Sequence, residues 1–333
     1  ISQLESSKVG YEDLNELIKD ETTSLKGAFL LKVKDIAFVY QKYQEYLTAV
    51  ENKIEEYFEP KDVMQKNVLD AMWYAITAGG KRIRPVLVMA VAELCGADLD
   101  DAASVALAVE CVHNYSLVHD DMPCMDDDNM RRGRLPCHKV FGEDIALLAG
   151  DGLLNSAFEI LSDEDRFKTI GAKELVSVIS CLSVASGAYG MIGGQVTDLE
   201  GEEKELTFDE LLKLHSLKTG RMIELSALLG CIAAGYSKDS KEACAVCAYA
   251  RNIGLAFQAI DDLLDRIGDE AVVGKTLCSD ADNQKTTFLS FYDIEGVRDY
   301  AKSLTDSAIS EVSAIEGSEL LCELALYLLE RDN

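Results

Sequence analysis

Residues 101–128 read DAASVALAVECVHNYSLVHDDMPCMDDD, and this stretch decides the fold class. Apolar residues recur over Asp101–Val118 at the spacing of an α-helix, without the alternation of a half-buried strand. Five aspartates follow within the nine residues from Asp120 to Asp128. The sequence therefore predicts an apolar helix that carries a cluster of carboxylates at its carboxyl end.

The same helical spacing recurs along the chain from residue 28 onward. Alanine and leucine are abundant and only four of the 333 residues are proline, a composition that favours helices. No alternating strand of useful length and no βαβ rhythm occurs. We therefore expect an all-α protein, one bundle of roughly ten helices. The predicted helices cover residues 28–58, 63–78, 85–94, 101–118, 145–161, 172–191, 208–234, 241–267, 294–315 and 318–329.

Several helix ends carry their own signals. Thr207 precedes Phe208-Asp209-Glu210, the pattern of an N-cap followed by acids in the first turn. Gly96 and Gly235 each follow an apolar helical run, where glycine commonly closes a helix.

Charge and cysteine content narrow the class of protein. Lysine and arginine number 32 and aspartate and glutamate 59, a formal net charge of −27. This balance argues against nucleic-acid binding, because phosphates would be repelled. The ten cysteines are scattered in apolar runs, which indicates buried thiols in a reducing compartment. We expect a cytoplasmic protein with no signal peptide and no transmembrane segment.

A second acidic cluster lies inside the helix predicted over residues 241–267, where residues 258–265 read QAIDDLLD. Asp261 and Asp265 are four residues apart and project from one helix face, although like charges at this spacing destabilise a bare helix. A solvated acidic face is the alternative interpretation, and we prefer it for Asp127-Asp128 taken alone. Two clusters, each at an apolar helix, favour binding of a hard cation, Mg²⁺ or Mn²⁺.

The first cluster needs a break in the helix to become a site. Asp120 and Asp126 are six residues apart, about 240° around an ideal helix, so a continuous helix would separate them. Pro123 lies between them and cannot continue the hydrogen-bond ladder. We expect a break there to swing Asp126 back towards Asp120.

Basic residues are also grouped, although the chain is acidic. Residues 79–85 read GGKRIRP, and glycines before a helix N-terminus let backbone N–H groups approach an anion. His113 lies two helical turns before Asp120 on the same face, with a core histidine as the alternative. Together with the acidic clusters, these cations predict a site for polyanions. The other cations lie at Arg131, Arg132, Arg134, Lys218, Arg221, Lys275 and Lys285.

In order and spacing these motifs resemble the short-chain trans-isoprenyl diphosphate synthases, the farnesyl and geranylgeranyl diphosphate synthase family. The resemblance covers about residues 63–329, and it implies the isoprenoid synthase helical bundle around a central active-site cavity. Its motifs are GGKRIRP (79–85), DDMPCMD (120–126) with Arg131-Arg132 behind it, GQVTD (194–198), KTG (218–220), FQAIDDLLD (257–265) and GK (274–275).

The resemblance implies a metal site and two diphosphate sites. Three Mg²⁺ ions, with Mn²⁺ as a substitute, would be held by Asp120, Asp121, Asp126, Asp261, Asp262 and Asp265. Isopentenyl diphosphate would be bound without metal by Gly80, Lys81, Arg84, His113 and Arg132. The allylic diphosphate would be bound by Arg131, Lys218, Thr219, Gln258, Lys275 and Lys285. Of these, Lys218, Thr219, Gln258 and Arg131 are the implied catalytic residues.

The implied reaction joins isopentenyl diphosphate head to tail with dimethylallyl or geranyl diphosphate. Metals and cations stabilise the departing diphosphate, and the C=C of isopentenyl diphosphate attacks the allylic cation. Tyr115 lies five residues before Asp120, about 7.5 Å along a helix. Its ring could close the bottom of the pocket that holds the hydrocarbon tail of the growing product. An aromatic residue at this position, followed here by Ser116, and two extra residues in the first motif resemble bacterial-type farnesyl diphosphate synthases, so the resemblance favours the C15 product, trans-farnesyl diphosphate.

The alternatives are a geranylgeranyl diphosphate synthase, a terpene cyclase and a non-catalytic regulatory subunit. A cyclase would typically lack the second aspartate cluster, and a regulatory subunit would be expected to lose a cluster or the Lys218-Thr219 pair. The resemblance further implies a homodimer. Residues 1–36 are expected to be an extension of unknown role and residues 37–333 the catalytic domain. Near the C-terminus, Arg331 is the candidate for the basic residue with which many relatives end.

Overall fold

The computed structural model describes residues 24–59, 61–201, 205–267 and 285–329. Within these ranges the chain is helical, and its extended pairing is limited to a bridge between Arg131 and Arg134, so the all-α prediction is confirmed. The α-helices are α3 (Ser24–Phe58), α4 (Lys66–Ile76), α5 (Ile83–Leu94), α6 (Leu99–Asp120), α7 (Cys137–Phe141), α8 (Glu143–Ser162), α9 (Ala172–Ser186), α10 (Met191–Gly201), α11 (Phe208–His215), α12 (Arg221–Ala233), α13 (Lys241–Ile267), α16 (Ile294–Val312) and α17 (Glu319–Leu329).

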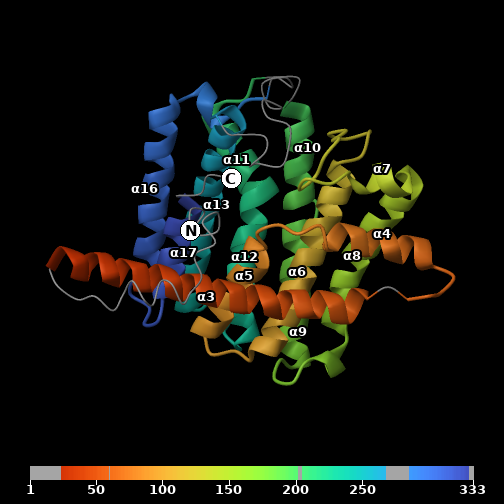
Figure 1. The fold of residues 1–333 in the computed structure, drawn as a ribbon, viewed down its shortest axis with the longest axis horizontal. Coiled ribbons are helices and arrows are strands. Elements are labelled where there is room, and N and C mark those ends of the chain that lie inside the picture. The colour runs from red at the N-terminus through yellow and green to blue at the C-terminus, as the bar shows by residue number, and fades with distance from the viewer. Residues whose placement is uncertain (1–23, 60, 202–204, 268–284, 330–333) are drawn as a thin grey trace.

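Helix α6 is the centre of the bundle, and it positions the first acidic cluster. It is buried along most of its length and packs against α3, α5 and α8. Figure 1 shows α3 running across the bundle, while α6, α8, α12, α13 and α16 stand roughly side by side above it. The second acidic cluster, on α13, therefore comes from the same bundle as the first.

Helices α5 and α12 cross so closely that their backbones are in contact. A Cβ added to Gly230 of α12 would lie 2.7 Å from the carbonyl oxygen of Val88 and 2.7 Å from the Cβ of Val91. Only glycine fits at such a distance. Because the basic stretch 79–85 leads into α5 and residues 218–220 lead into α12, this crossing fixes two parts of the predicted site relative to one another.

One of the predicted helices is broken in the structure, so its prediction as a continuous helix was wrong, whereas another contains a π-helix but stays helical throughout. The helix expected over 172–191 ends at Ser186, and α10, which the sequence did not predict, begins at Met191. At this break a Cβ on Gly190 would lie 1.9 Å from the carbonyl oxygen of Ala185. The helix expected over 208–234 is interrupted by a π-helix, Ser216–Gly220, between α11 and α12.

The predicted helix ends are confirmed. Thr207 caps α11 by accepting from the Glu210 N–H, and the Glu210 carboxylate accepts from the Thr207 N–H in return. Gly96 and Gly235 have φ of +80° and +83° just beyond α5 and α12. Both lie in hydrogen-bonded turns of the Schellman type.

Helix α3 continues without interruption through the predicted boundary between residues 36 and 37. The division of the chain at that point stays a prediction. From Val39 onward α3 is an integral part of the bundle, with Tyr46, Val50, Ile54 and Phe58 in the core.

Three described helical stretches are long and apolar enough to cross a membrane by length and composition alone: Glu143–Ser162, Ala172–Gly201 and Lys241–Arg266. In the structure 44%, 39% and 56% of their most apolar windows are buried. The second stretch is broken between α9 and α10. The expectation that the chain has no membrane span stays a prediction.

Candidate active site

The turn after α6 folds the first acidic cluster back on itself. Asp120 is the last residue of α6, and the N–H of Asp126 donates to the carbonyl oxygen of Asp120 at 2.9 Å. The expected break around Pro123 is thus confirmed. Burial and the charges of Asp126 and Asp121 raise the pKa of Asp120 to about 6, partly opposed by Lys218. The raised pKa shows that holding these carboxylates close together is unfavourable while they are ionised. They therefore form a candidate site for a cation.

A tight hairpin directs Arg131 and Arg132 to different partners. The two N–H···O bonds between Arg131 and Arg134 close it, with Arg132 and Gly133 at φ of +51° and +72°. Arg131 donates through Nε to Asp121 at 2.7 Å and also contacts Asp128. Asp128 thus takes part in an ion pair with Arg131, whereas we expected a solvated side chain.

Arg132 turns towards the glycine loop and α6. It donates to the carbonyl oxygen of Gly79 and approaches His113 Nε2 at 3.4 Å. Arg84 approaches the same nitrogen at 3.4 Å. A Cβ on Gly80 would lie 2.6 Å from Arg132 Cζ, so this position requires glycine. The structure therefore brings together Gly80, Arg84, His113 and Arg132, as predicted for one site.

Electrostatics fix the protonation of His113. Burial, followed by the positive charges of Arg84 and Arg132, holds its pKa well below the usual value, so the ring is neutral. Both guanidinium groups can only donate, so Nε2 must accept and the proton is assigned to Nδ1. His113 is then a neutral spacer between two cations, which leaves their charge available for an anion.

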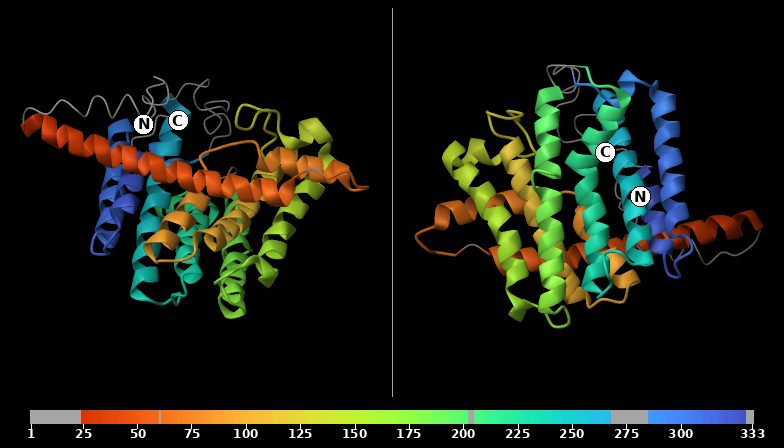
Figure 2. Two further views of the ribbon diagram at one scale, coloured as in Figure 1. Left: turned by 60° about the horizontal axis from the view of Figure 1, so that its bottom comes forward. Right: turned by 180° about the vertical axis from the view of Figure 1, so that it is seen from behind.

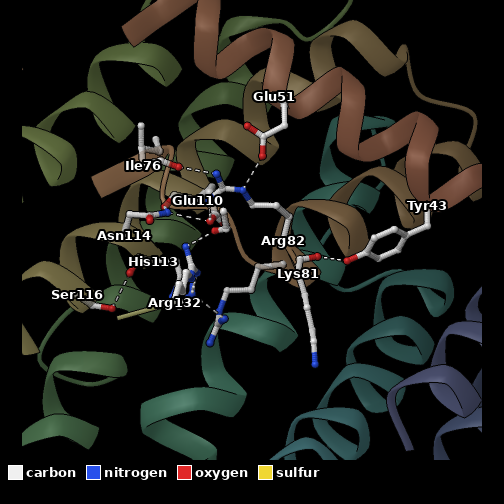
Figure 3. Close-up of polar contacts among 12 residues, drawn as sticks. Tyr43, Glu51, Ile76, Lys81, Arg82, Glu110, His113, Asn114, Ser116 and Arg132 are labelled. Atoms are coloured by element: carbon white, nitrogen blue, oxygen red, sulfur yellow. Dashed lines mark hydrogen bonds and ion pairs between the residues drawn. The ribbon is translucent and has the colours of Figure 1, made fainter. Parts of the chain in front are cut away.

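Arg82, the middle cation of GGKRIRP, has a different environment. Its side chain is fully buried and pairs with Glu51 of α3 and Glu110 of α6, whereas Lys81 and Arg132 extend to the other side of the cluster (Figure 3). Its φ of +47° is costly for a residue with a Cβ, about 1–2 kcal/mol. No pattern in the sequence indicates that Arg82, Glu51 and Glu110 contact one another.

The π-helix presents Lys218 to a buried carboxylate that the sequence analysis did not assign. Lys218 Nζ lies 2.5 Å from Asp198 Oδ2, and Lys285 Nζ lies 3.3 Å from the same oxygen. Gly194 of α10 allows this approach, because a Cβ there would lie 2.4 Å from the Lys218 N. Asp198 and Gly194 both belong to the motif GQVTD (194–198), but no side-chain pattern marked Asp198 as a partner of two lysines.

The second acidic cluster lies on α13, with Asp262 and Asp265 buried. Asp262 Oδ2 accepts from the Phe288 N–H at 2.8 Å and lies 3.9 Å from His215 Nε2. Gln258 lies one turn before Asp261 and so on a similar face of the helix. Asp262 therefore also anchors the chain at Phe288.

Charges from the acidic clusters and from the basic groups act on one another. The charge of Lys218 acts on Asp120, and the charge of Asp261 acts on Arg84. The ends of α6, the π-helix, the start of α5 and α13 thus lie within electrostatic reach of a common space. Thr219 is half-buried in the same π-helix. Lys275 lies outside the described residues, as does Arg331.

Tyr115 and Ser116 differ in orientation. Tyr115 is 6% exposed, its hydroxyl has no hydrogen-bond partner among the described residues, and its ring packs edge-on against His119. Ser116 Oγ donates to the carbonyl oxygen of His113 in its own helix. Of the two, Tyr115 has the side chain that occupies space beside the site.

The donor set fits a hard divalent cation. Carboxylate oxygens from two helices suit Mg²⁺, which usually takes one or two carboxylates and completes its shell with water and substrate phosphates. Among the described residues no three acidic, His or Cys side chains are already assembled closely enough to hold a metal.

Comparisons with known proteins agree with this geometry. A model of the family described as Polyprenyl synthetase matches residues 65–318. The chain is 39% identical over 293 residues to the farnesyl diphosphate synthase of Bacillus subtilis, which covers 85% of this chain and 95% of that protein. It is 39% identical over 268 residues to the geranylgeranyl diphosphate synthase of Cyanophora paradoxa, with coverage of 80% and 88%.

A solved structure supports the fold. The geranyltransferase from Helicobacter pylori, complexed with magnesium and isoprenyl diphosphate, superposes with a TM-score of 0.76 at 30% identity, covering 89% of this chain and 96% of that one. The family match extends over most of the helical bundle described above. The chain therefore belongs to the polyprenyl synthetase family and is a prenyltransferase.

Proposed function

We propose that this prenyltransferase condenses isopentenyl diphosphate with dimethylallyl or geranyl diphosphate, and that its main product is trans-farnesyl diphosphate. The observation that best supports the proposal is that the turn after α6 brings Asp126 back to Asp120 beside the hairpin of Arg131 and Arg132, while Arg132 meets Arg84 at His113. One diphosphate can be held by metal and lysine beside a second one held by arginine. The name of the Bacillus subtilis relative supports the C15 product.

The proposed roles follow the resemblance of the motifs, and contacts among the described residues support them. The isopentenyl diphosphate site comprises Gly80, Lys81, Arg84, His113 and Arg132. The allylic diphosphate site comprises Arg131, Lys218, Thr219, Gln258, Lys275 and Lys285. Asp198 pairs with both Lys218 and Lys285 through one carboxylate oxygen, and so it holds the two ammonium groups close together.

Asp120, Asp121, Asp126, Asp261, Asp262 and Asp265 are the proposed ligands of three Mg²⁺ ions, with Mn²⁺ as a substitute. The Helicobacter pylori structure, which contains magnesium and isoprenyl diphosphate, supports this assignment. When bound, the metal neutralises the developing charge of the leaving diphosphate. Lys218, Arg131 and Lys285 add positive charge on the same leaving group, and the apolar walls exclude water from the allylic cation.

Product analysis tests the proposed function. The purified protein is incubated with Mg²⁺, isopentenyl diphosphate and one allylic diphosphate at a time, and the dephosphorylated alcohols are identified. Farnesol from both the C5 and the C10 primer is expected. A dominant C20 alcohol would instead favour a geranylgeranyl diphosphate synthase, which the Cyanophora paradoxa relative represents. Absence of any condensation by folded protein would favour a regulatory subunit.

Replacing Tyr115 with alanine is expected to shift the main product from C15 to C20 or longer. The buried ring fills space beside Asp120 without a hydrogen bond, so its removal opens room for the growing tail. Ser116→Ala is the matched control, because the Ser116 hydroxyl is bonded within its own helix. Products are separated by chain length. An unchanged C15 product in Tyr115→Ala would remove this residue from the chain-length argument.

We also propose a homodimer that works in the cytoplasm. Helices α8, α9 and α10 lie together on one side of the bundle (Figure 2, right). They expose large apolar side chains there, each 45–65% exposed, at Leu147, Leu148, Val176, Val184, Ile192 and Val196. An apolar surface of this kind is typical of an interface. Sedimentation at twice the 36.5 kDa protomer mass is the expected result.

A further inference from the structure

We propose that Arg82 does not bind substrate but positions the isopentenyl diphosphate site, and that Glu51 of α3 and Glu110 of α6 hold it there. The inference rests on the proposed function, since it concerns how the cations around Arg82 are presented to a diphosphate. According to this proposal, α3 helps to position the basic residues of the active site.

The hydrogen bonds of Arg82 are used within the protein. Its side chain is 0% exposed, and it donates through Nε to Glu51 Oε1 at 2.9 Å and through Nη1 to Glu110 Oε1 at 2.6 Å. Nη2 donates to the carbonyl oxygen of Ile76, at the end of α4. Arg82 thus joins α3, α4 and α6 at the start of α5 (Figure 3). A guanidinium with all three nitrogens engaged in this way is not available to a diphosphate.

The backbone of Arg82 explains why such anchoring matters. Arg82 is the N-cap of α5 and has φ of +47°, a left-handed conformation that a residue with a Cβ adopts only when its surroundings impose it. This turn separates the direction of Lys81 from that of Arg84. The ion pairs with Glu51 and Glu110 stabilise the turn, and so they set where both neighbouring cations lie.

Helix α3 makes a second contact with the same turn. The hydroxyl of Tyr43 donates to the carbonyl oxygen of Lys81, the residue before Arg82. Two consecutive residues of the basic loop are therefore bonded to α3. Loosening either contact should change how the loop presents its cations, while the acidic clusters, which lie at the end of α6 and on α13, keep their geometry.

Glu110 also balances charge in this cluster. It is 1% exposed, and its Oε1 accepts from Asn114 Nδ2 at 2.8 Å as well as from Arg82. Burial lowers the pKa of Arg84 and of Arg132, and the Glu110 carboxylate opposes that shift for both. Glu110 thus offsets part of the cost of burying the charges of Arg84 and Arg132.

Glu51 provides the test, because its side chain is 39% exposed and the buried Arg82 keeps its ion pair with Glu110 when Glu51 is replaced. Glu51→Ala is expected to weaken binding of isopentenyl diphosphate about 5- to 10-fold in calorimetry, the loss of one charge-assisted hydrogen bond. Binding of geranyl diphosphate with Mg²⁺ should change less than about twofold. Glu51→Gln should recover part of the affinity, because its amide oxygen can still accept from Arg82 Nε.

Controls separate positioning from a general effect. Glu55→Ala removes the same charge from an exposed site one turn further along α3 and should leave both affinities unchanged. Tyr43→Phe should reproduce the selective loss for isopentenyl diphosphate. Equal weakening of both ligands in Glu51→Ala, or unchanged binding of isopentenyl diphosphate, would overturn the proposal. Because binding is measured without turnover, failure of the proposed condensation would be seen separately, in the product analysis of the unaltered protein.

Discussion

Replacing Asp120 with asparagine is expected to lower kcat by at least about 100-fold and, at the same time, to raise the melting temperature of the metal-free protein at pH 7.5. The activity falls because a carboxylate that we assign to the metal is lost. The stability rises because of the pKa of Asp120. Burial and neighbouring carboxylates raise that pKa to about 6, above the 3.8 of an unperturbed aspartate.

The sign of the stability change follows from linkage. A carboxyl whose pKa is higher in the folded state favours folding while it is protonated, and this contribution is lost as pH rises from 3.8 through about 6. At pH 7.5 the ionised Asp120 therefore destabilises the folded protein, and asparagine removes that cost. At pH below 3.8 the advantage of the variant should disappear.

Thermal melts in a chelator, together with steady-state rates in Mg²⁺, check both parts. Asp127→Asn makes the same chemical change in the same turn, at a side chain that is 61% exposed, and should alter rate and melting temperature little. A simultaneous fall of activity and stability in Asp120→Asn would contradict the interpretation, since it would describe a structural aspartate.

The parts of the fold that depend on local pattern could be predicted from the sequence. The helix over 241–267 was predicted with the bounds that α13 has, because apolar spacing continues to both ends. The return of Asp126 to Asp120 could be predicted because proline stops a helix wherever it lies in the interior. These features need only a few neighbouring residues.

Neither the break between α9 and α10 nor the π-helix could be predicted from the apolar pattern. The sequence 172–191 keeps helical spacing through Gly187 and Gly190, and the π-helix at 216–220 keeps it through Lys218. The need for glycine at position 194 is evident only in the structure, where α10 lies against the Lys218 backbone. A close approach between distant segments leaves no periodic signal in either one.

The partners towards which the arginine side chains point could likewise not be predicted from the sequence. Arg82 stands between Lys81 and Arg84 in an apparently uniform basic stretch, yet it faces Glu51 and Glu110, which lie 31 and 28 residues away in sequence. Arg131 and Arg132 are adjacent and point to different partners because Arg132 has a positive φ. When a residue other than glycine adopts a positive φ, nothing in the local sequence indicates it.

Replacing Gly80 with alanine is expected to weaken binding of isopentenyl diphosphate about 30- to 100-fold, while binding of the allylic diphosphate changes little. Gly80 has φ of +110°, and a Cβ there would lie 2.6 Å from Arg132 Cζ and 2.8 Å from Nε. The guanidinium would have to move, which would break its bond to the Gly79 carbonyl oxygen and its approach to His113. Isopentenyl diphosphate would then lose its contact with the correctly oriented guanidinium of Arg132.

Gly79 provides the control that separates displacement of Arg132 from backbone strain. It also has a positive φ, +81°, but a Cβ there would meet nothing within 4 Å. Gly79→Ala therefore adds strain, about 1–3 kcal/mol, without moving Arg132. Calorimetry with isopentenyl diphosphate should show the large loss in Gly80→Ala alone. If both variants lose affinity equally, the glycines serve the turn and not the arginine, and Arg132 would have to be reassigned away from the diphosphate.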